Sequence, residues 1–488
     1  MLSFANLLNC KVHKLPLKFL GLPLGANPGR KSMWKPVLHK IKVKLAGWKR
    51  KLLSFAGRLT LIKSVLSSLP TYYLSLFKMP EGVAKEIEKI QAAFLWGGND
   101  LKRKVHLVKW VDITKLANQG GLGIRRIRDV NTCLLLKWWW KFGNQVNALW
   151  RRAICSKYKI NENCWHPPLE SHYKHSRLWT DIISIGASSR NIFNFYLVYC
   201  LIKVGNGSRI LFWHDKWCGG LCLKSEFPLL YNLTTENEGS LHYFYHRKFS
   251  SDNWNFQYRR ELYDWELLEE IRLVIVLSSS PPLCLDMVDC LVWANGSFSV
   301  SALYSFSSSQ HGPLLQICKF VWYNALPPKV LFFGWLAWKN RLKTAELLHR
   351  LGILSSSAST LCPFCSSEIE TAVHILLHCP FSWCIWSSVI QDWGFNWCIQ
   401  GSVEGLFYWW MGGKLKRLEK KIWKAIPLVV LWSLWKHRNE CVFSLSQPNS
   451  FGLYDLIKTR TVLWLKATSK DFPLSVDDYL FKWNQIRC

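Results

Sequence analysis

The chain has 488 residues, of which 49% are hydrophobic and 15% aromatic, with 29 Trp, and this composition excludes a disordered basic tail. Its length indicates about three domains, each able to bury a core of its own. The 63 Lys and Arg against 32 Asp and Glu give a net charge of +31. On a folded chain this charge favours a polyanionic partner, and it favours nucleic acid over an anionic membrane surface.

The N-terminal part of the chain is one-sided in charge, because no Asp or Glu precedes Glu81. Apolar residues at helical spacing predict a helix over 34–48, a second over 52–69 that Pro70 stops, and a third over 81–96 that ends at Gly97. Lysines occupy the remaining positions of the first helices, and such cationic faces suit phosphate contacts, although a solvated face of a helical bundle has the same pattern. The candidate nucleic-acid-binding residues are Lys35, Lys40, Lys42, Lys44, Lys49, Arg50, Lys51, Arg58, Lys63, Lys102, Arg103 and Lys104.

The next segments carry little chemistry. The glycines of 120–123 lack the spacing of a dinucleotide-binding loop and predict a turn before a helix over 130–142, so no nucleotide cofactor is implied. Residues 151–312 have short apolar runs and many turns, as expected of a mixed α/β connector. His214 and Asp215 are adjacent, and neighbours on a strand point to opposite faces, so their positions do not predict a catalytic dyad. The Ser-rich residues 305–312 predict a linker.

The most specific motif is C-x2-C-x8-H-x4-C, formed by Cys362, Cys365, His374 and Cys379. Three thiols and one imidazole make a complete tetrahedral set, which predicts a closed, structural Zn2+ site rather than a catalytic one that keeps a position open for water. His378 leaves an ambiguity, because it follows His374 by four residues and could replace His374 or Cys379 as a ligand. We favour His374 with Cys379. The alternative is that the cysteines are ordinary buried thiols.

Helices are predicted on both sides of this motif. An almost wholly apolar one covers 330–338, where aromatic side chains favour a core over a base-stacking platform. Another, over 341–351, has Thr344 as N-cap and Gly352 as its stop. After the motif, a basic helix over 414–424 precedes a separate buried helix over 426–435, whose apolar run is too short to span a bilayer.

No secretory signal or transmembrane segment is evident, so the protein is expected in the nucleus or cytoplasm, with its 17 Cys reduced and no membrane partner.

The sequence segments 19–25, 53–66, 69–73, 94–98 and 115–123 resemble the region that follows the polymerase palm in LINE-type, non-LTR retrotransposon reverse transcriptases of plants. In that family the region would serve as a thumb-like part that grips template and primer. The block from 318 to 400 resembles the family's reverse-transcriptase zinc-binding domain, whose ligand pattern falls on the four motif residues. The resemblance covers about nine-tenths of the chain, most clearly at 19–25, 53–66, 69–73, 94–98, 115–123 and 362–379.

The polymerase chemistry of that family is not recognisable here. A reverse transcriptase holds two Mg2+ ions with an aromatic-x-Asp-Asp turn and a third Asp, and the sequence offers only Asp477-Asp478 without the aromatic context. We interpret this pair as the start of a helix, so no Mg2+ site is identified and the chain is not expected to be an enzyme. We expect a truncated remnant that binds zinc and RNA or DNA, mainly through the nucleic-acid backbone, with an intact reverse transcriptase in trans as a further candidate partner. The alternative is a domesticated or incidental protein-interaction module with a structural zinc.

The resulting expectation is a mainly α, multi-domain fold with some β structure in the middle. Its parts are a basic helical thumb-like domain (1–150), the mixed connector (151–312), the zinc-binding domain (313–400) and a C-terminal helical region (401–488).

Overall fold

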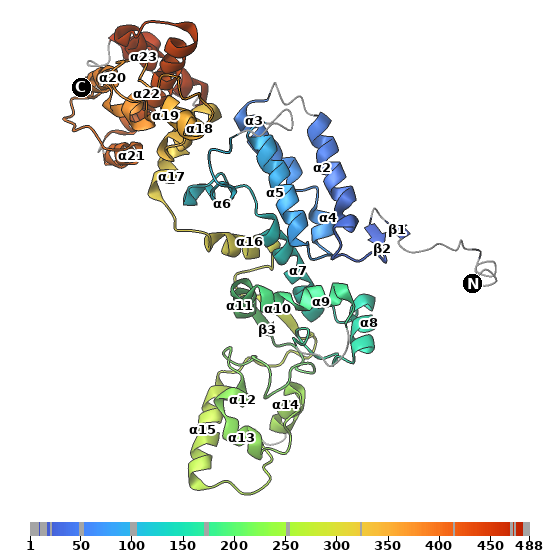
Figure 1. Ribbon diagram of the computed structural model, residues 1–488. Helices are drawn as coiled ribbons and strands as arrows, with labels where there is room; N and C mark the ends of the chain where they lie inside the picture. Colours follow the sequence, from blue (N-terminus) through green and yellow to red (C-terminus); the bar gives the residue numbers. More distant parts are fainter. Residues whose placement is uncertain are drawn as a thin grey trace. The chain divides into compact units, whose positions relative to one another are not determined.

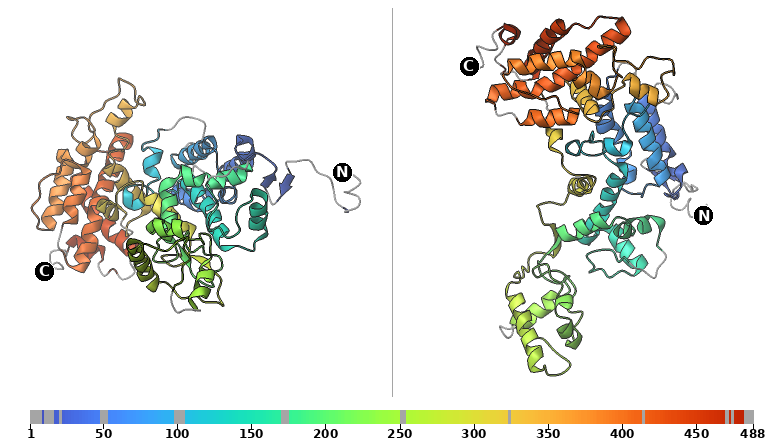
Figure 2. Two further views of the ribbon diagram at one scale, coloured as in Figure 1. Left: turned by 90° about the horizontal axis from the view of Figure 1, so that it is seen from below. Right: turned by 60° about the vertical axis from the view of Figure 1, so that its left-hand side comes forward.

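A computed structural model describes residue 9 and residues 17–19, 22–47, 53–97, 105–169, 175–249, 254–322, 325–412, 415–468, 472 and 475–481. Helices dominate these residues (Figures 1 and 2), and two small antiparallel sheets accompany them. In the first sheet Leu17 of β1 (Leu17–Phe19) pairs with Leu24 of β2 (Leu22–Leu24). The second pairs β3 (Cys200–Lys203) with β4 (Cys290–Trp293), near the middle of the sequence. The prediction of a mainly α fold with some β structure is confirmed.

The chain divides into two compact units, each assembled from separate segments. The first comprises Met1–Ile41, Ser67–Ile87 and Arg125–Gln310, and the second Lys42–Leu66, Glu88–Ile124 and His311–Cys488. The finer division into four domains stays a prediction.

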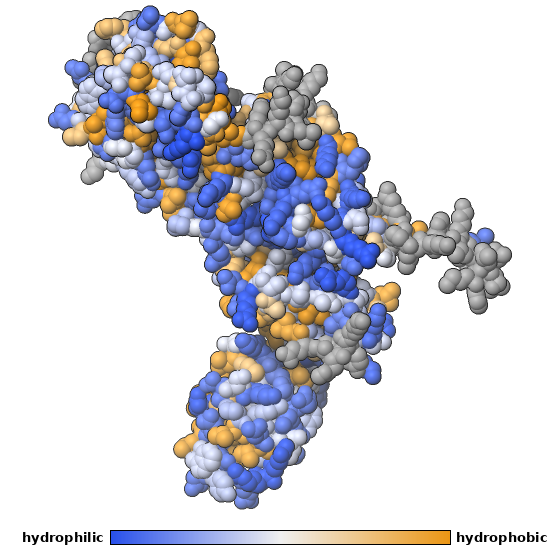
Figure 3. Space-filling model, viewed as in Figure 1, coloured by the Kyte–Doolittle hydropathy of each residue, from blue (hydrophilic) through white to orange (hydrophobic). Residues whose placement is uncertain are grey.

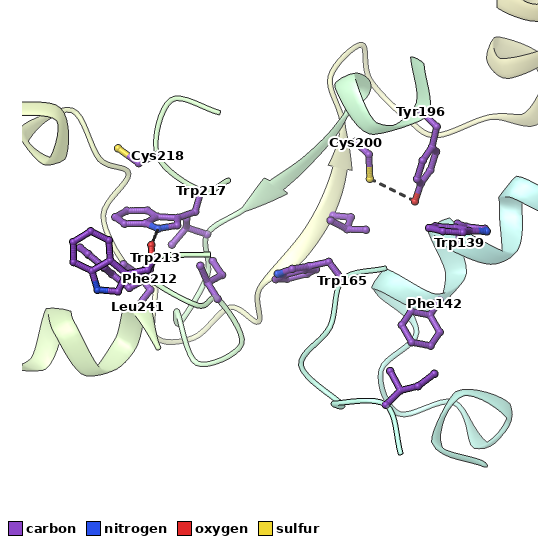
Figure 4. Packing of buried hydrophobic residues seen from close by; sticks show 14 of the residues in the cluster. Trp139, Phe142, Trp165, Tyr196, Cys200, Phe212, Trp213, Trp217, Cys218 and Leu241 are labelled. Atoms are coloured by element: carbon purple, nitrogen blue, oxygen red, sulfur yellow. Dashed lines mark hydrogen bonds between the residues drawn. The ribbon is translucent and has the colours of Figure 1, made fainter. Parts of the chain in front are cut away.

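The first unit is built around α7 (Ile127–Asn144), which packs against α16 (Val300–Ser309), α4 (Thr71–Leu74), α9 (Arg177–Ile183) and β4. Trp139 and Phe142 of α7 lie in its core, and Figure 4 shows Trp139 facing Tyr196. The other elements of this unit are η1 (Lys31–Trp34), α8 (Leu149–Tyr158), α10 (Ile185–Ser188), α11 (Arg190–Tyr199), α12 (Leu223–Glu226), α13 (Pro228–Leu233), α14 (Leu241–Phe249) and α15 (Asp264–Ser278).

The Ser-rich stretch predicted as a linker is largely helical, so that prediction is wrong. Ser299 caps α16 by accepting a hydrogen bond from the Ala302 N–H, and Phe306 stacks on Phe195 with ring centroids 3.9 Å apart. This packing outweighs the weak helix preference of serine. The boundary between the two units nevertheless falls inside the stretch, after Gln310.

Two helices of the basic N-terminal part have segments in both units, α2 (Lys35–Gly47) and α5 (Glu81–Leu95). In α2 the apolar side chains predicted to face inward, Val37, Leu38, Ile41 and Leu45, are all buried. The α5 helix ends before Gly97, whose positive φ of 78° closes it as expected. Figure 3 shows hydrophilic side chains over much of the visible face of these helices.

The helix predicted over 52–69 is shorter and changes type. Ser54 caps α3 (Phe55–Leu61) by accepting from the Gly57 N–H at 3.2 Å, and the chain then continues as a π turn, η3 (Ile62–Leu66), before Pro70. The glycine turn at 120–123 is present, with positive φ at Gly120 and Gly123.

The described regular elements of the second unit are helices, apart from an isolated bridge between Leu361 and Ile369. Among them, α22 (Arg417–Ser444) packs against α23 (Ser450–Thr468) and α18 (Pro328–Trp338). No helix in the described ranges is long and apolar enough to cross a membrane. The remaining elements are α6 (Trp110–Ile113), η4 (Ala117–Gln119), α17 (Gln316–Val321), α19 (Ala345–Arg350), η5 (His374–His378), α20 (Pro380–Asp392), α21 (Val403–Met411) and α24 (Val476–Phe481).

The two helices predicted over 414–424 and 426–435 form one helix, so the expected separation is wrong. Pro427 lies inside α22 and lacks the N–H that would pair with the carbonyl of Trp423, four residues earlier. The indole N–H of Trp410 donates to that carbonyl at 2.7 Å, and the Trp423 indole donates to the Trp410 carbonyl at 3.0 Å. This tertiary pair replaces the missing helical bond, which sequence spacing could not reveal.

Candidate metal centre

The first two candidate ligands lie on a tight turn. The Cys362 N–H donates to the Glu368 carbonyl at 2.7 Å, and the Ser366 N–H donates to the Cys362 carbonyl at 2.8 Å. Ser366 has a φ of 57°, in the left-handed region that allows so sharp a reversal. The turn therefore places the side chains of Cys362 and Cys365 close together.

The other two candidate ligands are joined by a π turn. The Cys379 N–H donates to the His374 carbonyl at 2.7 Å, an i→i+5 bond that stacks the fifth residue above the first. A regular α-helix would bring the fourth residue, His378, to that position instead. The spacing H-x4-C thus fits this rarer turn, which was not predicted from the sequence.

The π turn leaves carbonyl groups without helical partners, because Pro380 at the start of α20 has no N–H. The Ser382 hydroxyl donates to the Ile375 carbonyl at 2.6 Å, and the Trp386 indole donates to the Leu376 carbonyl at 2.8 Å. Both donors are buried on α20. These hydrogen bonds from α20 therefore hold the π turn in its conformation.

The structure brings all four predicted ligands together. The ligand atoms of Cys362, Cys365, His374 and Cys379 lie within 4.8 Å of one another. The Cys362 and Cys379 Sγ atoms are 3.9 Å apart, and the Cys365 Sγ is 3.4 Å from the His374 Nε2. With Zn–S bonds of about 2.3 Å and Zn–N bonds of about 2.0 Å, the edges of a tetrahedral site measure roughly 3.5–3.8 Å. The donor set and its spacing therefore fit Zn2+.

The local electrostatics lower the pKa of two of the three cluster thiols. The hydrogen bond between Cys362 and Cys379 lowers the pKa of the Cys362 thiol to about 6 and raises that of Cys379. Burial opposes ionisation of Cys365, but hydrogen bonds from the side chain and backbone of Ser367 outweigh it and lower its pKa. Thiolate is the form that binds metal.

His378 lies outside the cluster. Its side chain is exposed, and its Nε2 is 3.0 Å from the Gln400 carbonyl oxygen. The geometry thus favours His374 over His378 as the fourth donor.

A buried ion pair supports the metal turn, and the sequence analysis missed it. The Arg438 Nε and Nη2 each donate to one Glu370 carboxylate oxygen at 2.7 Å, and the Ala345 N–H also donates to this carboxylate at 3.1 Å. Glu370 is 1% exposed, and Thr344 caps α19 beside it. The pair links α22, α19 and the strand-like residues after Cys365. Its only sequence signal was a charged residue, Arg438, beside an apolar helix.

The candidate nucleic-acid-binding residues are only partly described. Lys35, Lys40, Lys42 and Lys44 are exposed on α2, opposite its buried residues. Arg58 is half-buried in a hollow, and burial lowers its pKa. The Lys63 ammonium lies against the turn at Gly123, and desolvation there lowers its pKa. The other six candidates, Lys49, Arg50, Lys51, Lys102, Arg103 and Lys104, lie outside the described residues.

Two pairs that invited a catalytic interpretation have structural roles. Asp215 accepts hydrogen bonds from the Leu211 N–H and the Trp165 indole, whereas the His214 imidazole lies 3.2 Å from Glu238. At the start of α24, Asp478 and Ser475 cap one another through reciprocal bonds of 2.9 and 3.0 Å. The predicted interpretation of the aspartate pair as a helix start is confirmed.

The fold and the site together define a mainly helical protein whose second unit carries a Cys3His cluster able to hold a metal ion. Residues 298–386 match the family described as zinc-binding in reverse transcriptase, and all four ligand candidates lie in this range. This part of the chain is derived from a reverse transcriptase.

Two relatives extend the similarity beyond that domain. A putative ribonuclease H protein of Arabidopsis thaliana is 29% identical over 435 residues, which are 85% of this chain and 64% of the relative. The chain thus spans somewhat less than two thirds of that protein. An uncharacterized mitochondrial protein of the same plant is 26% identical over 151 residues, 31% of this chain and 92% of the relative.

Proposed function

We propose that the chain is a nucleic-acid-binding remnant of a LINE-type reverse transcriptase, held together in its second unit by a structural Zn2+. The observation that carries this proposal is the Cys3His cluster inside the reverse-transcriptase zinc-binding match. RNA or DNA backbone phosphates are the proposed ligands of the basic helices. An intact reverse transcriptase is a further proposed partner.

The proposed metal role follows from the donor set. Four protein donors leave no open position, so Zn2+ would supply a cross-link between the turn at Cys362 and the π turn at His374, not a reactive water. Zinc content of the purified chain, measured by mass spectrometry, tests this role. The Cys365→Ser variant should lose the metal, and Cys384→Ser, which changes an exposed thiol of α20 outside the cluster, should retain it. Equal zinc content in the two variants would refute the ligand assignment.

The proposed nucleic-acid interface is the exposed face of α2. Its lysines are opposite the buried stripe, and phosphate contacts of this kind release counterions, so affinity should fall linearly in log salt. Changing Lys40, Lys42 and Lys44 together to Glu should weaken binding and flatten that slope. The matched control changes three exposed lysines of the first unit, Lys157, Lys203 and Lys216. Unaltered affinity of the α2 variant would contradict the proposal.

We further propose that these residues do not polymerise DNA by themselves. The support is that the only adjacent aspartates, Asp477 and Asp478, begin a helix, where Asp478 is engaged with Ser475. Primer extension on an RNA template with Mg2+ tests this. Activity that Asp477→Ala abolishes would overturn the proposal.

A second candidate function is protein binding, which one feature of the first unit favours. Helix α15 exposes an apolar stripe at helical spacing, with Leu268, Ile271 and Ile275 each more than half exposed. An interface of this kind should respond little to salt, in contrast to phosphate binding. A salt titration of any partner complex therefore separates the two functions.

A further inference from the structure

The second unit contains a groove that shares only Arg58 with the candidate residues described above. Two hollows of about 580 and 250 Å3 share Leu107 and Arg341 in their linings, so they lie side by side, and we treat them as one groove. Their described walls come from α3, from residues 95–96 and 105–112, and from α18 with the residues that follow it. The volume of the larger hollow is in the range of ligand sites in proteins.

The lining of this groove is strongly cationic. Among the described residues, Arg58, Lys109, Lys339, Arg341 and Lys343 line it, together with one acid, Asp112. That acid already forms an ion pair with Lys115 at 2.8 Å. Desolvation lowers the pKa of both Arg58 and Lys339, which is the behaviour of cations drawn partly out of water. Positive charge concentrated in a concave surface attracts an anionic ligand.

The groove also holds a column of aromatic rings. Phe332 stacks on Phe55 with centroids 3.4 Å apart and planes 12° apart, and Trp96 stacks on His106 at 6.5 Å. The two stacked pairs meet where Phe55 contacts Trp96 at 5.7 Å with the ring planes tilted by 50°. His106 is exposed. The column therefore ends in a ring on which another flat ring can stack.

Two hydrogen-bond donors in the lining lack acceptors. The indole Nε1 atoms of Trp96 and Trp110 are buried and make no hydrogen bond in the structure. A buried donor without a partner is rare because it is costly. An oxygen-rich ligand would supply the acceptors that these two donors lack.

We propose that this groove binds a single-stranded segment of RNA or DNA, with its phosphates on the Arg341 side and one unpaired base stacked on His106. The chemistry points to a single strand because only an unpaired base can leave its own stack to join an aromatic column. A simple anion would use the cations and leave the column unused. This proposal rests on the proposed nucleic-acid-binding function and assigns it a second site, distinct from the face of α2.

The test compares a fluorescent twelve-residue oligothymidylate with an abasic phosphodiester of equal length, each titrated with the whole chain at low salt. His106→Ala should weaken the oligothymidylate complex at least about fivefold and leave the abasic complex unchanged. His349→Ala, an exposed histidine on α19 that does not line the groove, is the matched control. Arg341→Gln should weaken both complexes, because it removes a phosphate contact.

Trp110→Phe separates binding from folding. This change removes a donor that has no partner in the structure, so thermal stability should be retained while affinity for oligothymidylate falls. A loss of stability with unchanged affinity would assign Trp110 a purely structural role and count against the groove.

Each failure has its own pattern. If the α2 lysine variant weakens binding but His106→Ala and Arg341→Gln do not, the groove proposal is wrong and the proposed function stands. If the wild-type chain binds the abasic oligomer as tightly as oligothymidylate, the base-stacking site is wrong. Preference for duplex over single strand overturns it as well. If neither oligomer binds, both proposals fail.

Discussion

Arg438 and Glu370 are 68 residues apart in sequence, yet their side chains meet in a two-pronged ion pair with both bonds at 2.7 Å. The Arg438 side chain is 7% exposed and that of Glu370 1%. A buried pair of this kind adds little stability over an apolar replacement, but breaking it leaves a charge without a partner. The pair therefore makes the metal turn, α19 and α22 depend on one another.

Glu370→Gln should destabilise the zinc-binding domain by about 3–5 kcal/mol, because Arg438 stays charged and buried. Hydrogen–deuterium exchange of amides in 360–380 reports this domain directly. The control is Arg350→Ala, which breaks an exposed i,i+4 pair of 3.6 Å with Glu346 and should cost less than about 1 kcal/mol. Replacing both partners, as Glu370→Leu with Arg438→Met, should recover much of the loss. Equal exchange in Glu370→Gln and the wild type would show that the pair does not couple these elements.

His374→Asn should abolish stoichiometric zinc binding, whereas His378→Asn should not. Only the first imidazole lies within the cluster, and the second contacts the Gln400 carbonyl. The loss of affinity should exceed the 10- to 100-fold typical of changes around the ligands. A competition titration with a chromophoric chelator measures it. The assignment of His374 is wrong if the two variants exchange these behaviours.

The sequence predicts the four ligands because they lie close together along the chain. It also predicts which face of each helix is buried, because buried residues recur with the helical period. In α2, Val37 and Ile41 are buried where the pattern placed them. It does not predict Glu370 with Arg438, since no local rule pairs distant charges. Nor does it predict the groove, whose walls come from segments as far apart as Phe55 and Phe332.

The continuity of α22 through Pro427 is the third relationship that can be tested. Trp410→Phe removes the donor to the Trp423 carbonyl and should cost about 1–3 kcal/mol for the unpaired carbonyl, in addition to lost packing. In the Pro427→Ala background the new N–H at 427 can pair with that carbonyl, so the same change should cost about 1 kcal/mol less. A double-mutant cycle by urea unfolding measures this coupling. Strictly additive effects would contradict the compensation inferred from the structure.

The first unit should lose stability in mild acid because of His166. Its Nδ1 is buried without a partner, and burial together with the nearby positive charge of Arg209 lowers its pKa from 6.5 to about 4. Between these two values the unfolded chain binds a proton that the folded chain does not. The contribution of neutral His166 to the free energy of unfolding is therefore fully present above pH 6.5, and it declines by up to about 3 kcal/mol as the pH falls toward 4.

His166→Gln should remove this part of the acid sensitivity, measured by urea unfolding at pH 7 and pH 4.5. His39→Gln, at an exposed position of α2, is the control and should follow the wild-type profile. An unchanged pH dependence in His166→Gln would assign the acid sensitivity to other groups.

Removal of zinc should weaken base binding in the groove without affecting the basic face of α2. The Arg438 guanidinium lies 5.1 Å above the ring of Trp435, and Trp435 lines the smaller hollow of the groove. Because Glu370 connects Arg438 to the metal turn, loosening that turn should disturb this wall. Chelation should therefore lower affinity for oligothymidylate and leave affinity for the abasic oligomer intact. The Cys365→Ser variant, already without metal, should show no further change on chelation. Equal losses for both oligomers would mean that the metal supports the fold of the whole unit and not the groove in particular.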